Sequence, residues 1–449
     1  MKLNILNLKF SKPLFTSPRT HEGAPAPVLT PEQSLRRSVL ACMLWEDEFY
    51  EGGVTIANRI RELVPQVAPE SVAALAVEAR TRMKLRHAPL LLLREMARHA
   101  SHRALVAETL AAVIQRADEL AEFVAIYWAE GKAPLSAQVK KGLAAAFTKF
   151  DEYTLAKYDR AGAVRLRDVL FLSHAKPVSA EQAELWKRLI DGALATPDTW
   201  EVALSASGTS PETNKREVWE RLLAERKLGA LALLRNLRNM LQAGVGEQAL
   251  KTALAELNTA RVLPFRYLAA ARHAPRLEEA LEAVMLRSVN TAEKLSGRTV
   301  LMVDVSGSMI APLSRRSEVL RTDAAYGLAV LLRELCEQVS IYTFSERTLL
   351  APPRRGFALR DALANSQPNH GTYLGRSLDD VAAMEPGTPA RTIVLTDEQS
   401  HDRVGAPLAA RGYMINVASA RNGVGYGNGW SHIDGFSEAV VEYIRAAEA

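Results

Sequence analysis

The stretch Thr299-Val300-Leu301-Met302-Val303-Asp304-Val305-Ser306-Gly307-Ser308 indicates an α/β fold for the C-terminal third of the chain. Its first five residues are apolar or β-branched and predict a short buried strand. The strand runs directly into a D-x-S-x-S turn, where Gly307 permits the tight bend between two serines. A strand that ends in a carboxylate and two hydroxyls is typical of a ligand site at the carboxyl edge of an α/β sheet.

Further strands and helices alternate along the rest of this region. The β-rich stretches are 339–344, 391–395 and 413–417, and the helical patterns cover 318–338, 374–384 and 437–447. Alternation of this kind favours a parallel, doubly wound sheet. The change from a helical to an alternating pattern falls at Gly297.

Two more oxygen-bearing side chains belong to the same predicted edge of the sheet. Thr372 lies just ahead of the helix that begins near Leu374, and Asp397 follows the strand at 391–395. The predicted ligands are Asp304, Ser306, Ser308, Thr372 and Asp397. Oxygen ligands with few carboxylates suit Mg²⁺, Mn²⁺ or Ca²⁺ better than zinc, so we expect one divalent cation, Mg²⁺. The alternative is a serine-rich turn whose hydroxyls cap the next helix.

The region before Gly297 has a different pattern. Residues 1–30 carry several prolines and little periodicity, which indicates an extended arm. Residues 31–296 are almost wholly helical in pattern, with Thr30 and Ser179 as N-caps and apolar spacing such as Val72, Leu75, Ala76 and Ala79. Many short helices without strand alternation favour a solenoid of paired helices. The predicted domains are therefore 1–30, 31–296 and 297–449.

Charge is distributed unevenly over the 449 residues. The net charge is +5 and the pI about 9.1. From Arg298 onward 15 Arg, no Lys and 17 acidic residues leave −2, so the preceding part carries +7. This modest excess attracts polyanions but does not by itself establish nucleic-acid binding. With no apolar run long enough for a membrane span, no signal peptide pattern and only Cys42 and Cys336, we expect a cytoplasmic protein with buried thiols.

The two regions together resemble a known family. The three oxygen-bearing loops are similar, in order, to the metal-ion-dependent adhesion site of von Willebrand factor A domains. The helical part resembles the TROVE module of the Ro ribonucleoprotein family. The stretches that carry this resemblance are 84–92 (KLRHAPLLL), 155–158 (LAKY), 169–177 (VLFLSHAKP), 233–240 (LLRNLRNM) and 261–265 (RVLPF).

The resemblance implies a ring of HEAT-like helical repeats with a positively charged central hole, which the von Willebrand factor A domain helps to close. It implies binding of 3′ single-stranded ends of misfolded or structured RNA in the hole, and of small Y-type RNA on the outer surface, for RNA quality control or processing. An exoribonuclease tethered through RNA is an implied partner. We expect a monomer with no catalytic activity of its own.

Basic residues of the helical part are the candidates for RNA contact. They are Arg82, Lys84, Arg86, Lys140, Lys141, Lys157, Arg160, His174, Lys176, Arg235 and Arg238. The segment 80–103 is rich in Arg and Lys, and helical spacing would place Arg80, Lys84 and His87 on one face. The alternatives are a solvated helix face for this segment, a core or capping role for His174, salt bridges for Arg235 and Arg238, and simple exposure for Lys140 and Lys141.

Two rival functions remain at this point. A protein-docking module would capture a partner's acidic side chain through the metal and use the helices as a scaffold. A metal-dependent nuclease would need a second metal cluster, a catalytic set of histidines or a phosphate loop, and the sequence shows none of these. We therefore expect an RNA-binding protein that is not an enzyme.

Overall fold

The computed structural model describes residues 18–40, 53–197, 199–209, 215–259, 262, 264–289, 293–313, 319–418, 420–435 and 439–448. Residues 1–17 of the predicted arm (1–30), Cys42, and Arg261 and Leu263 of one family motif lie outside the described residues. Among the described helices, none is both long and apolar enough to cross a membrane.

The helical part follows the predicted apolar spacing. Its first half contains α1 (Pro31–Leu40), α2 (Gly53–Leu63), α3 (Pro69–Thr81), α4 (His87–Arg98), α5 (Val106–Val113), α6 (Ala117–Tyr127), α7 (Ala137–Phe147), α8 (Glu152–Tyr158), α9 (Leu166–Ser173) and α10 (Ala180–Asp191). Helix α3 buries the four residues that the spacing selects, Val72, Leu75, Ala76 and Ala79. The N-caps are also confirmed, because Thr30 Oγ1 accepts from Gln33 N at 3.2 Å and Ser179 Oγ from Gln182 N at 3.2 Å.

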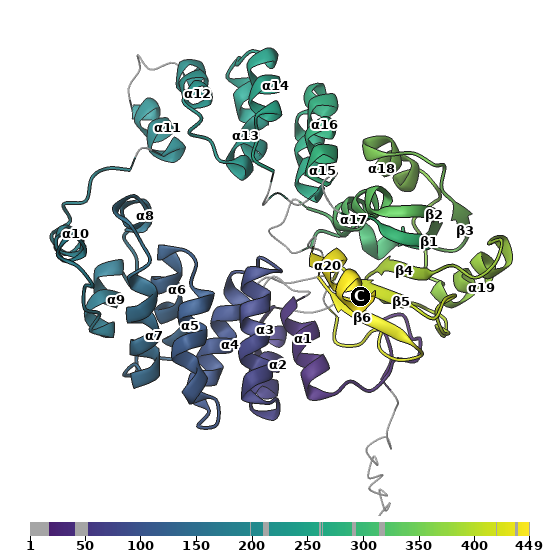
Figure 1. Ribbon diagram of the computed structural model, residues 1–449, viewed down its shortest axis with the longest axis horizontal. Coiled ribbons are helices and arrows are strands. Elements are labelled where there is room, and N and C mark those ends of the chain that lie inside the picture. Colours follow the sequence, from purple (N-terminus) through teal and green to yellow (C-terminus); the bar gives the residue numbers. More distant parts are fainter. Residues whose placement is uncertain are drawn as a thin grey trace, which may run out of the picture.

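The second half of the helical part continues the same arrangement. It contains α11 (Trp200–Thr209), α12 (Lys215–Ala224), α13 (Ala230–Gln242), α14 (Glu247–Ala255), α15 (Pro264–His273) and α16 (Glu278–Val289). The helices follow one another around a ring, and the C-terminal domain closes the ring between α1 and α16 (Figure 1). The ring of helices and the domain that closes it are thus confirmed.

The C-terminal domain is built on one six-stranded sheet. Its strands are β1 (Leu295–Asp304), β2 (Cys336–Phe344), β3 (Thr348–Leu350), β4 (Arg391–Thr396), β5 (Gly412–Asn416) and β6 (Trp430–Asp434). They lie in the order β3-β2-β1-β4-β5-β6, all parallel except β3. The helices are α17 (Arg321–Leu335), α18 (Gly356–Ala364), α19 (Leu374–Met384) and α20 (Ala439–Glu448). The doubly wound fold is confirmed, and its switch point lies between β1 and β4.

Two local predictions differ from the structure. The helix predicted at 318–338 ends at Leu335, because Cys336 begins β2 without an intervening loop. Strands β3 and β6 and helix α18 were not predicted. Strand β3 has only three residues, and β6 carries Ser431 and His432 in place of a continuous apolar run.

The apolar cores show how the parts are joined. One cluster holds α1 to α10 together, whereas a second runs from α12 through α16 into one face of the sheet with α17 and α20. At this junction a Cβ on Gly327 of α17 would lie 2.9 Å from the backbone nitrogen of Phe265 in α15. The missing side chain therefore allows the last helices of the ring to pack directly on the sheet domain.

Candidate metal centre and nucleic-acid interface

The fold brings the predicted metal ligands to one edge of the sheet. Asp304 ends β1 and Asp397 follows β4, and these neighbouring parallel strands pair Val303 with Leu395. Both carboxylates are fully buried. In the turn after β1, the hydroxyl oxygens of Ser306 and Ser308 lie 3.4 Å apart.

Hydrogen bonds tie the three ligand loops to each other. Gly307 N donates to the carbonyl of His370 at 2.9 Å, which links the β1 loop to the loop that carries Thr372. His401 N donates to the carbonyl of Thr372 at 2.8 Å, which links that loop to the segment after Asp397. The three loops are therefore fixed relative to one another by the backbone.

The electrostatics of this site are dominated by its buried carboxylates. Burial, followed by the negative charge of Asp397, raises the pKa of the Asp304 carboxyl well above its usual range. Two buried carboxylates close together are stabilised by a positive ion. Among the described residues no three His, Cys, Asp or Glu side chains form a metal cluster. The fit to a hard cation thus depends on hydroxyl oxygens beside the two carboxylates.

A buried arginine that sequence reasoning missed lies in the same site. Arg321 begins α17, and its Nη1 donates to Asp397 Oδ2 at 3.1 Å and to the carbonyl of Ser308 at 3.4 Å. The side chain is fully buried. Its only sequence signal is a cation at a helix start, where an acidic residue is the more favourable choice.

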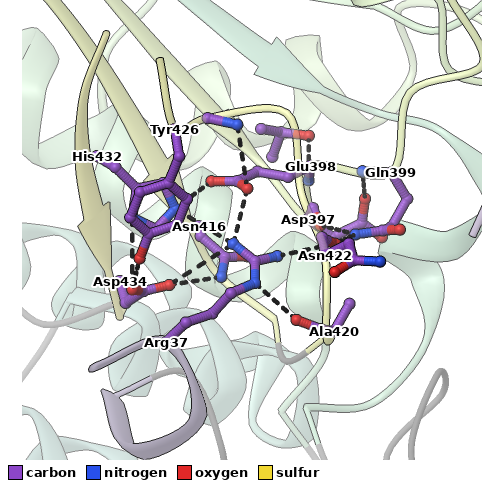
Figure 2. A network of polar contacts seen from close by, with 12 residues as sticks. Arg37, Asp397, Glu398, Gln399, Asn416, Ala420, Asn422, Tyr426, His432 and Asp434 are labelled. Atoms are coloured by element: carbon purple, nitrogen blue, oxygen red, sulfur yellow. Dashed lines mark hydrogen bonds and ion pairs between the residues drawn. The ribbon is translucent and has the colours of Figure 1, made fainter. Parts of the chain in front are cut away.

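A second buried arginine pairs with Glu398, the residue that follows Asp397. Arg37 of α1 donates from Nη1 to Glu398 Oε2 at 2.7 Å and from Nε to the carbonyl of Ala420 at 2.6 Å (Figure 2). His432 and Asp434 of β6 complete the cluster, with His432 contacting Glu398 and Asp434 Oδ1 3.9 Å from Arg37 Nη1. This network attaches the first ring helix to the sheet domain.

The network depends on an unusual backbone. Glu398 has a φ of +63°, which a non-glycine residue rarely adopts. A Cβ on Gly423 or Gly425 would lie 1.9 or 2.4 Å from the Glu398 carboxylate oxygens. Although burial works against the charged form, Arg37 and His432 outweigh it and hold the pKa of Glu398 at about 2.

The described part of the predicted arm contacts the segment 399–401, which follows Glu398. Thr20 Oγ1 donates to the carbonyl of Ser400 at 2.8 Å, and His21 N donates to Gln399 Oε1 at 2.7 Å. The Glu22 carboxylate lies 3.1 Å from His401 Nε2. Residues 20–22 therefore pack on the C-terminal domain, over the segment that follows Asp397.

The candidate RNA residues of the segment 80–103 are largely occupied by local contacts. Helix α3 ends at Thr81 and α4 begins at His87, so the prediction of one helical face for Arg80, Lys84 and His87 was wrong. Arg86 contacts Asp118 and Glu122 of α6. Arg82 lies 5.6 Å above the ring of Tyr443, and Lys84 is exposed with its amine on the carbonyl of Thr81.

The candidates on α7 and around α9 form a group on one part of the ring. Lys140 Nζ lies 3.5 Å from His174 Nε2, and His174 ends α9 in a left-handed conformation with φ of 55°. Lys141, His174 and Lys176 are exposed. Phe171, which lies three residues before His174 on α9, is 58% exposed. We call Lys140, Lys141, His174 and Lys176 the outer basic cluster.

The remaining candidates lie on α8, in the turn after it, and on α13. Lys157 Nζ lies 5.7 Å from the ring centre of Tyr158, and Arg160 is exposed. Arg235 and Arg238 are exposed on α13, where the positive charge of Arg235 adds to burial in lowering the pKa of Arg266. Arg235 therefore increases the local positive potential instead of cancelling a carboxylate.

A ring of helical repeats closed by a sheet domain with a switch-point site defines a helical-repeat protein with a von Willebrand factor A-like domain. Comparison with known proteins agrees. The TROVE domain model matches residues 187–325, from α10 into α17. The crystal structure of the Ro (RSR) protein of Deinococcus radiodurans aligns with a TM-score of 0.63 and 19% identity, over 94% of this chain and 100% of that chain. The chain thus carries a match to the TROVE domain model over part of its helical region and shares its fold with that Ro protein.

A short segment is also similar to much larger proteins. Telomerase protein component 1 of Mus musculus and that of Rattus norvegicus are each 36% identical over 96 residues, which is 20% of this chain. The aligned segment is only 4% of those proteins.

Proposed function

We propose that the protein binds structured non-coding RNA in the manner of Ro proteins and serves RNA quality control or processing. Single-stranded 3′ ends enter the positively charged centre of the ring, and a Y-type RNA binds the outer basic cluster. The protein acts as a cytoplasmic monomer without catalytic activity, and an exoribonuclease is tethered to it through RNA.

The observation that carries this proposal is the outer basic cluster. Lys140, Lys141, His174 and Lys176 have no carboxylate partner within the described residues. A side chain whose charge is not cancelled locally attracts phosphate and releases condensed counterions on binding. Exposed Phe171 offers a surface for stacking, which is sequence-tolerant. Backbone-led recognition of this kind suits RNA chosen by shape.

The metal site is proposed to hold one Mg²⁺ between Asp304, Ser306, Ser308, Thr372 and Asp397. The bound ion would supply a positive centre for an acidic group of a partner protein. The oxygen-only donor set favours this second, protein-docking function over a nuclease reaction. The two functions occupy separate sites, so loss of the metal leaves RNA binding intact.

The test measures binding of a 3′-tailed hairpin RNA and identifies the RNA that copurifies with the protein. Changing Lys140, Lys141 and Lys176 to Glu lowers the affinity by about tenfold or more, because three phosphate contacts become repulsive. A control with the same charge change spread over Lys187, Lys251 and Lys294 keeps most of the affinity. Equal losses in both variants would contradict the outer site, and loss of RNA binding by Asp304→Ala with an intact fold would contradict separate sites.

A further inference from the structure

Arg321 is placed where a cation would compete with it. Its guanidinium is fully buried and contacts the carboxylate of Asp397 and the carbonyl of Ser308, so it joins two of the three ligand loops. A buried arginine is stable only when it is paired. Neutral donors hold the other carboxylate: Asp304 accepts from Ser306 N at 2.9 Å and from Thr396 Oγ1 at 2.6 Å.

The charge balance of the site follows from these contacts. Counting only Asp304, Asp397 and Arg321, with both carboxylates ionised as they are when they ligate a cation, these groups carry −2 from the carboxylates, which Arg321 reduces to −1. A divalent cation would change the balance to +1, whereas without Arg321 it would give neutrality. Repulsion between the bound ion and the guanidinium therefore opposes cation binding, and the low dielectric of a buried site strengthens that repulsion.

We propose that Arg321 is an internal counter-ion of the metal site, which keeps the domain folded without metal and makes divalent cation binding weak and reversible. The inference rests on the proposed metal site. It adds to that site that the bound ion is exchangeable, so that occupancy of the site follows the concentration of free cation. A partner that docks through the ion would then bind only when the cation is supplied.

The experiment compares the full-length protein with Arg321→Met, which keeps a long side chain but removes the charge. Mn²⁺ affinity is measured by calorimetry, and the Tm is measured in EDTA and in excess Mg²⁺. Arg333→Met is the matched control, because Arg333 lies on the same helix with a partly exposed side chain.

We expect Arg321→Met to bind Mn²⁺ about tenfold or more tightly than the unchanged protein, and to depend on the ion for stability. Its Tm should fall by several degrees in EDTA, whereas the Tm of the unchanged protein and of Arg333→Met should shift little. Equal or weaker Mn²⁺ binding by Arg321→Met would overturn the inference. So would unfolding of the unchanged protein in EDTA.

A second variant covers the case in which Arg321→Met does not fold. Arg321→Lys keeps the charge, so it should fold in EDTA and bind Mn²⁺ within about threefold of the unchanged protein. Much tighter binding by Arg321→Lys would contradict a role through charge. If neither the unchanged protein nor Asp304→Ala binds Mn²⁺, the proposed metal site is wrong, and this inference is wrong with it. The RNA measurements do not depend on that result and still test the proposed RNA binding.

Discussion

The basic residues of α3 and α4 and those of the outer basic cluster have opposite surroundings. Arg80 pairs with Glu119 at 2.7 Å and Arg94 with Glu130 at 2.9 Å, and Arg86 contacts two more acids of α6. The lysines of the outer basic cluster form no ion pair with a carboxylate among the described residues. A paired arginine stabilises the packing of neighbouring helices, whereas an unpaired lysine remains available to a polyanion.

This difference teaches that the density of basic residues in a sequence does not locate the binding surface. The segment 80–103 has the more concentrated charge, yet most of it is cancelled by carboxylates about one repeat further along the ring. Arg37 is the extreme case of a paired cation, because its partners hold the ring closed against the sheet domain. The predictions below separate stability from RNA affinity on this basis.

The largest effect is expected for Arg37→Met. Removing one partner of a buried ion pair leaves Glu398 charged and buried, which costs about 3–5 kcal/mol in the free energy of unfolding. Urea denaturation measures the loss. The control is Arg36→Met, whose pair with Glu78 is partly exposed and should contribute about 1 kcal/mol or less. A loss below about 1 kcal/mol for Arg37→Met would show that the network does not support the fold.

The same network predicts how stability depends on acid. The pKa of Glu398 is about 2 in the folded protein against 4.5 for the free side chain, so its contribution is present above about pH 4.5 and is lost as the pH falls toward 2. In Arg37→Met the pKa of Glu398 rises, so this contribution is already missing at higher pH. Measuring the Tm from pH 6 to pH 2 should show the two proteins converging in acid. A constant difference across that range would contradict the assignment to Glu398.

A smaller loss is expected for Arg80→Met, which removes the partner of buried Glu119. Glu119 also accepts from the backbone nitrogens of Gln115 and Arg116, and these bonds keep part of its stabilisation. The cost should be about 2–3 kcal/mol in unfolding free energy. RNA affinity at a temperature where the variant is folded should change by less than about twofold. A tenfold loss of RNA affinity would place RNA on the α3–α6 surface. It would contradict the view that the paired arginines there serve stability and not RNA binding.

The sequence was a good guide where the signal is local. The strand that ends at Asp304, the D-x-S-x-S turn and the apolar face of α3 each depend on residues a few positions apart, and all three appear as predicted. Asp397 comes to the same edge as Asp304 because β4 pairs in parallel with β1, and hydrogen bonds between the loops bring Thr372 to that edge. The ring itself followed from the ordered family motifs and not from any clear repeat.

What the sequence could not show are the long-range partners. Arg321 meets Asp397 across 76 positions and Arg37 meets Glu398 across 361, and no spacing rule connects such pairs. The same reason explains why Arg86 looked available for RNA, since its acidic partners lie more than 30 positions further along the chain. Charge pairing over these distances is decided only by packing.

The most direct test of RNA binding by the outer basic cluster is the salt dependence of RNA affinity. Lys140, Lys141 and Lys176 changed together to Gln should reduce the slope of log affinity against log salt by about 2 to 3, because each lysine neutralises about one phosphate. Arg86→Gln, measured in parallel, should leave the slope unchanged. Identical slopes for the triple variant and the unchanged protein, or a reduced slope for Arg86→Gln alone, would contradict the account.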